Sequence, residues 1–208
     1  MSIDPHTVAQ TLLDADAVLL RPDDPFTFAS GLLSPVYCDN RLLLGNVAAR
    51  RTITTAFVPH SDDAEVLAGT ATSGIPWAAW VAEQLALPMA YVRGSAKGHG
   101  RGQQIEGAAV AGRRVVLLED TISTGESALV AAEALRNSGA EVVRCVCIFT
   151  WSWAATNERF ETANVPLHLL ATLPDLLEVA ANAGRLSAAH RTLIEAWAND
   201  PQGWQTNH

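Results

Sequence analysis

The sequence has few cysteines, a single lysine and no apolar run of the ~20 residues that a membrane-spanning helix needs. Three cysteines without zinc-ligand spacing argue against a disulfide framework or a zinc module, and they favour a reducing compartment. The first ten residues, MSIDPHTVAQ, lack the basic start and apolar centre of a signal peptide. These absences predict a cytoplasmic protein that does not associate with membranes.

Positive charge is also scarce. The net charge is −8 and the pI about 5.1, which argues against general nucleic-acid binding. Thirteen of the 14 basic residues are arginine, and the one lysine, Lys97, stands in a glycine-rich segment that reads RGSAKGHGRGQQ over residues 93–104. With 49% hydrophobic and 17% charged residues, the composition is that of an ordinary globular protein, and 208 residues suit a single domain.

Short apolar runs alternate with helical patterns through most of the chain. We expect strands at 66–68, 89–92, 115–118, 141–149 and 167–173. Helices are expected at about 46–58, before the first of these strands, and at about 75–86, 126–138 and 154–164 between strands. This alternation predicts a right-handed α/β core with a parallel sheet.

The two ends of the chain have a different pattern. Asp4-Pro5 indicates a helix start, and Val8, Leu12, Leu13 and Val18 are expected to form an amphipathic first helix or its edge. Residues 26–39, FTFASGLLSPVYCD, alternate loosely between turn residues and predict a hairpin-like hood. Two further helices are expected at 174–184 and 186–200, and residues 201–208 are expected to form a tail.

The most informative stretch is 114–127, RVVLLEDTISTGES. Its apolar start predicts a strand buried on both faces, and Glu119 and Asp120 follow at the carboxyl end. Hydroxyl residues and Gly125 then lead into a helix, whose free N–H groups and positive dipole end favour an anion. A carboxylate pair suits hydroxyls or a hydrated cation instead. The stretch therefore predicts a site for a sugar phosphate.

Two other segments support an anionic ligand. The strand at 66–68 ends in Gly69-Thr70-Ala71-Thr72-Ser73-Gly74 before the next helix, which is either a second anion site or an ordinary tight turn. The segment 93–104 concentrates Arg93, Lys97, His99 and Arg101 among glycines. It is either a lid that closes over a polyanion or a solvated surface loop.

The stretch 114–127 contains neither a Walker loop nor a Rossmann glycine turn. It resembles the phosphoribosyl-diphosphate (PRPP) signature of type I phosphoribosyltransferases, in which an apolar strand, two acidic residues and T-G-x-S follow one another. Together with FTFASGLLSPVYCDNR, GTATSGIPWAAWVAEQL and YVRGSAKGHGRGQQIEG, it resembles orotate phosphoribosyltransferase in the bacterial form with an AKGHG lid. The resemblance is clearest from about Phe26 to Phe149.

This resemblance implies the type I phosphoribosyltransferase fold, a parallel sheet flanked by helices with a small hood. The whole of 1–208 would be one domain, with the hood at about 1–45 plus the C-terminal helices and the core at about 46–173. The implied reaction transfers phosphoribose from PRPP to orotate, giving orotidine 5′-monophosphate and pyrophosphate in de novo pyrimidine (UMP) biosynthesis. The resemblance also implies Mg²⁺, bound mainly through PRPP, and a homodimer whose lid reaches the neighbouring active site.

The resemblance further implies roles for particular residues. The catalytic residues would be Lys97 and His99, which with Arg93 would reach the pyrophosphate. Glu119 and Asp120 would hold the ribose hydroxyls, and Ser123 would contact orotate. The 5′-phosphate would be bound by the turn made of Thr121, Ile122, Ser123, Thr124, Gly125, Glu126 and Ser127. No residue is expected to bind a metal directly. No covalent nucleophile is needed, because the lid can stabilise the departing pyrophosphate electrostatically.

Some positions depart from the family pattern. Leu33, Ser73 and Gly94 stand where many members have lysine, and Thr150-Trp151 stand where some relatives have an orotate-binding arginine. The way in which orotate is held is therefore left open. Two alternatives remain: a PRPP-dependent transferase for another base, and a non-catalytic PRPP-sensing regulator.

Overall fold

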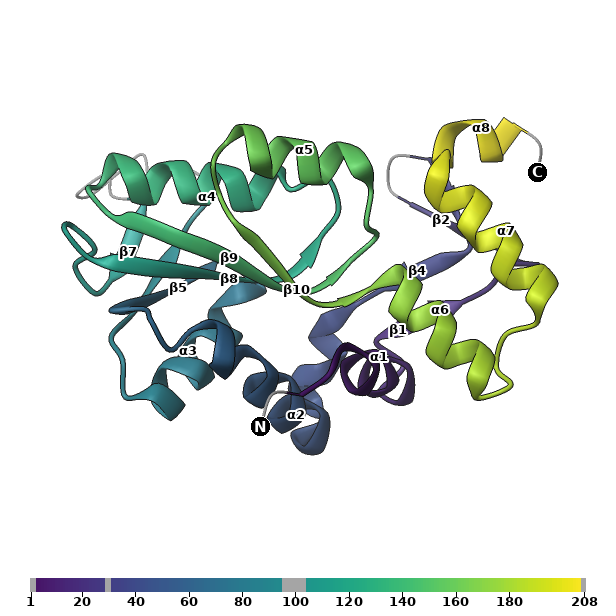
Figure 1. Ribbon diagram of the computed structural model, residues 1–208, viewed down its shortest axis with the longest axis horizontal. Helices are drawn as coiled ribbons and strands as arrows, with labels where there is room; N and C mark the ends of the chain where they lie inside the picture. The colour runs from purple at the N-terminus through teal and green to yellow at the C-terminus, as the bar shows by residue number, and fades with distance from the viewer. Residues whose placement is uncertain (1–2, 29–30, 95–103, 207–208) are drawn as a thin grey trace.

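The computed structural model describes residues 3–28, 31–94 and 104–206. Its centre is a six-stranded sheet in the order β10-β9-β8-β5-β6-β7 (Figure 1). The strands are β5 (Val66–Thr70), β6 (Met89–Val92), β7 (Ile105–Gly107), β8 (Arg114–Ile122), β9 (Glu141–Thr150) and β10 (Leu167–Thr172). All neighbours pair in parallel except β7, which is antiparallel to β6. The predicted α/β fold is confirmed.

Helices cover both faces of this sheet, because the strands are apolar on both sides. On β8, Val116 and Leu118 join the core under α2 (Val47–Phe57) and α3 (Gly74–Leu85). Val115 and Leu117 join the core under α4 (Glu126–Asn137) and α5 (Ala154–Thr162) on the opposite face (Figure 1). Two buried layers therefore hold β8 rigidly in the middle of the molecule.

The hood lies beyond one end of the sheet. Its strands form two antiparallel pairs, β1 (Val18–Leu20) with β4 (Val36–Cys38) and β2 (Phe26–Thr27) with β3 (Leu33–Ser34). The C-terminal helices α6 (Leu173–Asn182), α7 (Ala188–Asn199) and α8 (Pro201–Thr206) lie at the same end (Figure 1). The indole N–H of Trp197 on α7 donates to the carbonyl of Leu33 at 3.0 Å, which joins the two parts of the hood.

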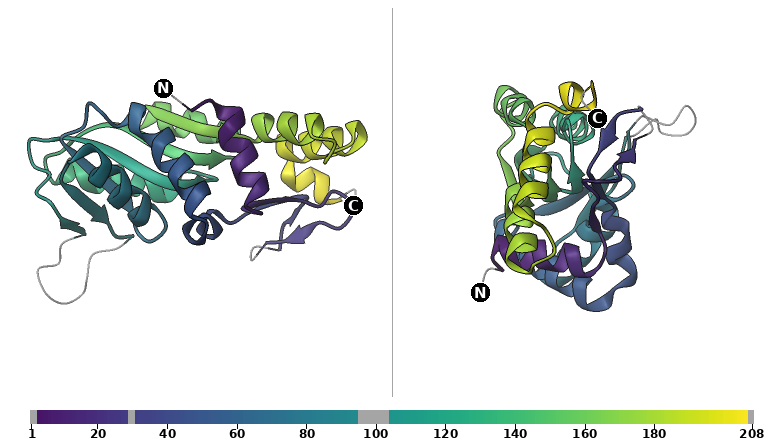
Figure 2. Two further views of the ribbon diagram at one scale, coloured as in Figure 1. Left: turned by 90° about the horizontal axis from the view of Figure 1, so that it is seen from below. Right: turned by 90° about the vertical axis from the view of Figure 1, so that its right-hand side faces the viewer.

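Side-chain caps begin several of the helices. The Asp4 side chain accepts from the Thr7 N–H at the start of α1 (Pro5–Asp14), and Asn46 and Ser187 cap α2 and α7 in the same way. Helix α1 packs against α2, α6 and β10, and so lies between the sheet and the C-terminal helices (Figure 2). Two 3₁₀ segments, η1 (Asn40–Gly45) and η2 (Val58–His60), flank α2.

Two local expectations were wrong. Residues 201–206 form α8 rather than a tail, because Asp200 accepts from the Gly203 N–H at 2.9 Å and Trp204 is buried beside β3. Val18 belongs to β1 rather than to the first helix. In addition, β8 extends to Ile122, so the carboxylate pair lies within the strand and not after it.

Candidate active site

The carboxyl ends of β8 and β5 meet in the middle of the sheet. The two strands are parallel neighbours with Leu118 paired to Gly69, and each continues into a small-residue turn and a helix. Residues that are about 50 positions apart in the sequence therefore lie side by side. This edge of a parallel sheet is where ligands of open α/β folds bind.

The turn after β8 encloses a cavity of about 60 Å³ in front of the first turn of α4, lined by Glu119 and residues 121–128. Gly125 adopts a left-handed φ of +78°, and a Cβ at this position would lie 2.5 Å from the Phe160 ring. Helix α5 supports the turn from outside: Thr156 donates to the Ser123 carbonyl at 2.6 Å, and Arg159 to the Thr124 carbonyl at 2.9 Å. The turn is small, rigidly held and open at a helix start, as a phosphate site requires.

The two carboxylates lie beside this cavity. Glu119 is 7% exposed; its Oε2 accepts from the Thr70 hydroxyl at 2.5 Å and its Oε1 from the Asp120 N–H at 2.9 Å. Burial raises the pKa of Glu119 to about 8, and the adjacent Asp120 contributes to that rise. Burial also raises the pKa of Asp120. The pair therefore retains a proton more readily than free carboxyl groups do, and hydrogen-bond donors from a ligand would favour its ionised form.

The turn after β5 comes into close contact with β8. A Cβ on Gly69 would lie 2.5 Å from the Gly74 carbonyl oxygen, and a Cβ on Gly74 would lie 2.5 Å from the Leu118 carbonyl oxygen. Both positions therefore require glycine. The Ala71–Thr72 peptide bond within this turn is cis.

A cavity of about 240 Å³ lies between this second turn and α4. Thr70, Ala71, Arg93, Glu126 and Ser127 are among its lining residues, so it shares Glu126 and Ser127 with the smaller cavity. The Arg93 guanidinium pairs with Glu106 at 3.0 Å, which holds it at the cavity wall. Two adjacent turns and one guanidinium thus surround a space larger than one phosphate.

The structure brings together most of the residues that the sequence singled out. Glu119, the turn from Thr121 to Ser127 and Arg93 all line these two cavities. The Ile122 side chain is buried in the core, so only its backbone can face a ligand. Lys97 and His99 lie outside the described residues.

Sequence reasoning missed Asn40, and it did not give Thr70 a role of its own. Asn40 is 1% exposed and donates to the Asp120 carbonyl at 2.7 Å and to the Thr121 hydroxyl at 3.0 Å, which fastens the hood to the turn. Both residues act across more than 40 positions of sequence. In the sequence, the signal for Asn40 or Thr70 was no more than a polar residue next to a recognised motif.

Two of the departures from the family pattern, Trp151 and Leu33, pack against the hydrophobic core. Trp151 is 6% exposed and packs edge-on against Phe149 and Trp197. The Leu33 side chain is partly buried against the main core, and its backbone carbonyl accepts the Trp197 hydrogen bond. An arginine at 151 would bury a charge within this aromatic cluster. Trp151 instead joins the end of the sheet to the hood through its contacts with Phe149 and Trp197.

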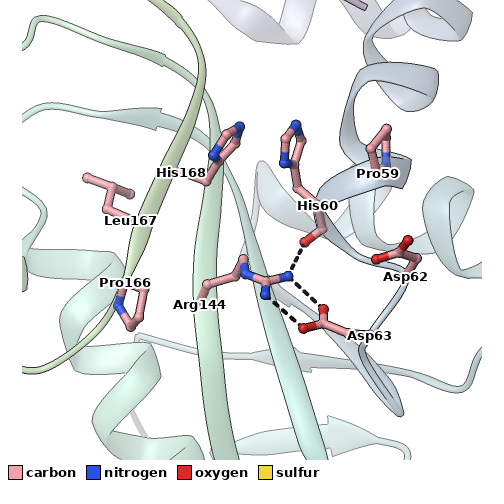
Figure 3. Close-up of a pocket in the computed structure, with 8 residues that line it drawn as sticks. All are labelled: Pro59, His60, Asp62, Asp63, Arg144, Pro166, Leu167 and His168. Atoms are coloured by element: carbon pink, nitrogen blue, oxygen red, sulfur yellow. Dashed lines mark hydrogen bonds and ion pairs between the residues drawn. The ribbon is translucent and has the colours of Figure 1, made fainter. Parts of the chain in front are cut away.

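A cavity of about 410 Å³ lies elsewhere, near the amino ends of β9 and β10 (Figure 3). Arg144 there is held by Asp63 through two hydrogen bonds of 2.6 and 2.7 Å, and the His60 and His168 rings stack at 3.5 Å. Its charged residues are one guanidinium and the two carboxylates of Asp62 and Asp63. Such a lining does not suit a phosphorylated ligand.

Within the described ranges, no group of three or more His, Cys, Asp and Glu side chains has a metal-binding arrangement. No helix among the described residues is both long and apolar enough to span a bilayer. Cys38, Cys145 and Cys147 are free thiols.

The chain is similar to known proteins in both sequence and structure. Residues 48–162 match the phosphoribosyl transferase domain. The chain is 47% identical to the orotate phosphoribosyltransferase of Halalkalibacterium halodurans over 96% of its own length and 98% of that protein. It superimposes on the orotate phosphoribosyltransferase of Aeropyrum pernix with a TM-score of 0.72 and 33% identity, covering 85% of this chain and 98% of the other. The Mycobacterium tuberculosis enzyme solved with 5-phospho-α-D-ribosyl 1-diphosphate matches with a TM-score of 0.66 and 25% identity over 84% and 99% of the two chains.

Proposed function

The chain belongs to the orotate phosphoribosyltransferase family, a family of pentosyltransferases, and on this premise we propose how its residues carry out the transfer. The substrates are PRPP and orotate. The bond between C1 of the ribose and the diphosphate oxygen breaks, a bond forms to N1 of orotate, and the N1 proton leaves. The products are orotidine 5′-monophosphate and pyrophosphate.

The observation that carries this proposal is the contact between the two turns. A phosphate-sized cavity of about 60 Å³, the buried Glu119 with the partly buried Asp120, and a second cavity of about 240 Å³ lie around the carboxyl ends of β8 and β5. We assign the 5′-phosphate to the turn from Thr121 to Ser127, the ribose hydroxyls to Glu119 and Asp120, and the diphosphate to the second cavity. Ser123, at the rim of the turn, is assigned to orotate.

Negative charge builds on the departing diphosphate, and cations nearby lower the energy of that transition state. Arg93 is at the cavity wall, and we assign Lys97 and His99 to the same task. Mg²⁺ prefers oxygen ligands and retains water, so PRPP oxygens and water suit it as ligands. When bound, it would neutralise part of the diphosphate charge.

We propose a homodimer in which the lid of one subunit completes the active site of the other. Mixing two impaired variants, assayed at a PRPP concentration at which neither alone has appreciable activity, tests this arrangement. Lys97→Ala and Asp120→Asn subunits, mixed in equal amounts and allowed to exchange, would regain about a quarter of the wild-type activity, because half the dimers contain one site with both native groups. No recovery, with exchange verified by a tag, would place the lid over its own subunit.

The choice of base is tested by pyrophosphate release from PRPP with orotate, uracil, adenine and hypoxanthine in parallel. Orotate is expected to support release and the others to give little. Preference for another base would contradict the assignment, and PRPP binding without any release would indicate a regulator.

The free thiols support a reducing cytoplasm as the location. We also propose that residues 1–208 act as one domain.

A further inference from the structure

Thr70 lies at the junction of the two turns. It is the last residue of β5 and 4% exposed, and its hydroxyl donates to Glu119 Oε2 at 2.5 Å. The same hydroxyl is 3.4 Å from the Leu118 carbonyl oxygen. A Cβ on Gly74 would lie 2.6 Å from the Thr70 hydroxyl oxygen, so the glycine leaves room for this contact.

We infer that Thr70 is a positioning residue: its hydroxyl holds the Glu119 carboxylate toward the ribose diol and joins the diol site to the diphosphate turn. This inference rests on the proposed function, since it takes PRPP as the ligand. Thr70 also lines the cavity assigned to the diphosphate, so one side chain links both halves of the substrate.

The hydroxyl matters because Glu119 has few other donors. Besides Thr70, the Asp120 N–H donates to the other oxygen of this carboxylate, and the hydrogen bond shared with the Asp120 side chain favours the protonated form of Glu119 rather than its ionised form. A buried carboxylate that loses a donor becomes harder to ionise and freer to rotate. The ribose hydroxyls would then face a carboxyl group that is more often protonated or is oriented away from them.

The surrounding groups do not replace this donor. Titratable and charged groups near the pair lie on β8, on β9, at the start of α4 and in the hood. They are Asp120, Cys145, Cys147, Glu126, Cys38, Asp39 and Arg41. Burial raises the pKa of Cys38 to about 12 and those of Cys145 and Cys147 well above their usual value, so these thiols stay neutral. Arg41 is bound to Asp39 at 2.6 Å.

The test compares Thr70→Val, which keeps the shape and removes the hydroxyl, with Thr70→Ser, which keeps the hydroxyl. Thr54→Val is the matched control, because Thr54 is a buried threonine of α2 whose hydroxyl bonds to the Arg50 carbonyl at 2.8 Å, away from the site. Calorimetric PRPP binding with Mg²⁺, measured from pH 6 to 9, is combined with KM and kcat for PRPP.

For Thr70→Val we expect about tenfold weaker PRPP binding at pH 7. The rise of affinity with pH should move upward by about one pH unit. KM should change more than kcat. Thr70→Ser and Thr54→Val should both have the PRPP affinity, pH dependence, KM and kcat of the wild type.

A purely structural role would lower the melting temperature of Thr70→Val and leave the pH profile unmoved, and that result would overturn the inference. Equal loss in Thr70→Ser would overturn it as well. If the wild-type protein itself fails to bind PRPP, the proposed function fails, which this design separates from failure of the Thr70 role.

Discussion

Gly125→Ala perturbs the turn after β8 with a single methyl group. Gly125 has a left-handed φ of +78°, where an alanine costs about 1 kcal/mol relative to glycine. The added Cβ would also lie 2.5 Å from Cε2 and 3.3 Å from Cδ2 of Phe160. That ring is 2% exposed and has little room to retreat, so overpacking adds about 1–3 kcal/mol.

The free energy of unfolding should therefore fall by about 2–4 kcal/mol. Because the turn would move to relieve the contact, its N–H groups would lose their alignment with the 5′-phosphate that we assign to them. A displacement near 1 Å can lower kcat/KM on the order of 10²-fold.

Gly112→Ala is the matched control for urea unfolding. Gly112 has a similar φ of +70°, and a Cβ there would meet nothing within 4 Å, so only the backbone cost applies. The difference between the two variants isolates the Phe160 contact. A Gly125→Ala protein that loses no more stability than Gly112→Ala and binds PRPP normally would refute the packing of Phe160 beneath the turn.

Three further predictions follow from the site and its surroundings. Lys97→Ala should lower kcat by about 10²-fold or more with PRPP saturating, as expected for a transition-state contact, and near-normal turnover would exclude that role. Asp120→Asn should weaken PRPP binding by about 10- to 100-fold in calorimetry while circular dichroism stays native, because a hydrogen bond to a charged group is lost; unchanged affinity would refute the diol assignment. Burial lowers the pKa values of the stacked His60 and His168 below 6.5, so their neutral forms favour the fold above that pH and stability is lost as pH falls below it. His168→Phe should lose less stability between pH 7 and 5 in urea titrations, and an unchanged pH slope would contradict this contribution of the histidine pair.

The architecture was largely predictable because local sequence patterns indicate the strands and helices. Val115–Leu118 is apolar without interruption, and Asn46 and Ser187 are capping residues placed before helical patterns. The length of β8 was not predictable, since Glu119 and Asp120 are poor strand formers and remain in the strand through pairing with β9. Helix α8 was missed because its stability comes from burying Trp204 against a distant hairpin.

The site was predictable where it is a contiguous motif and not where it depends on contacts across the fold. The turn from Thr121 to Ser127 could be identified from its order of acids, hydroxyls and glycine. The contacts of Asn40 with Thr121 and of Thr70 with Glu119 join segments that only the topology brings together. No periodicity marks a long-range hydrogen bond.

We have assigned the two cavities at the carboxyl ends of β8 and β5 to PRPP, which is bound there for phosphoribosyl transfer to orotate. The most direct measurement is the loss of orotate absorbance in the presence of PRPP and Mg²⁺, with orotidine 5′-monophosphate identified by chromatography. We expect the absorbance to fall only when both PRPP and Mg²⁺ are present, and the fall to be abolished or strongly reduced in Asp120→Asn. If the orotate absorbance stays unchanged while the protein binds PRPP, the proposed transfer to orotate is contradicted.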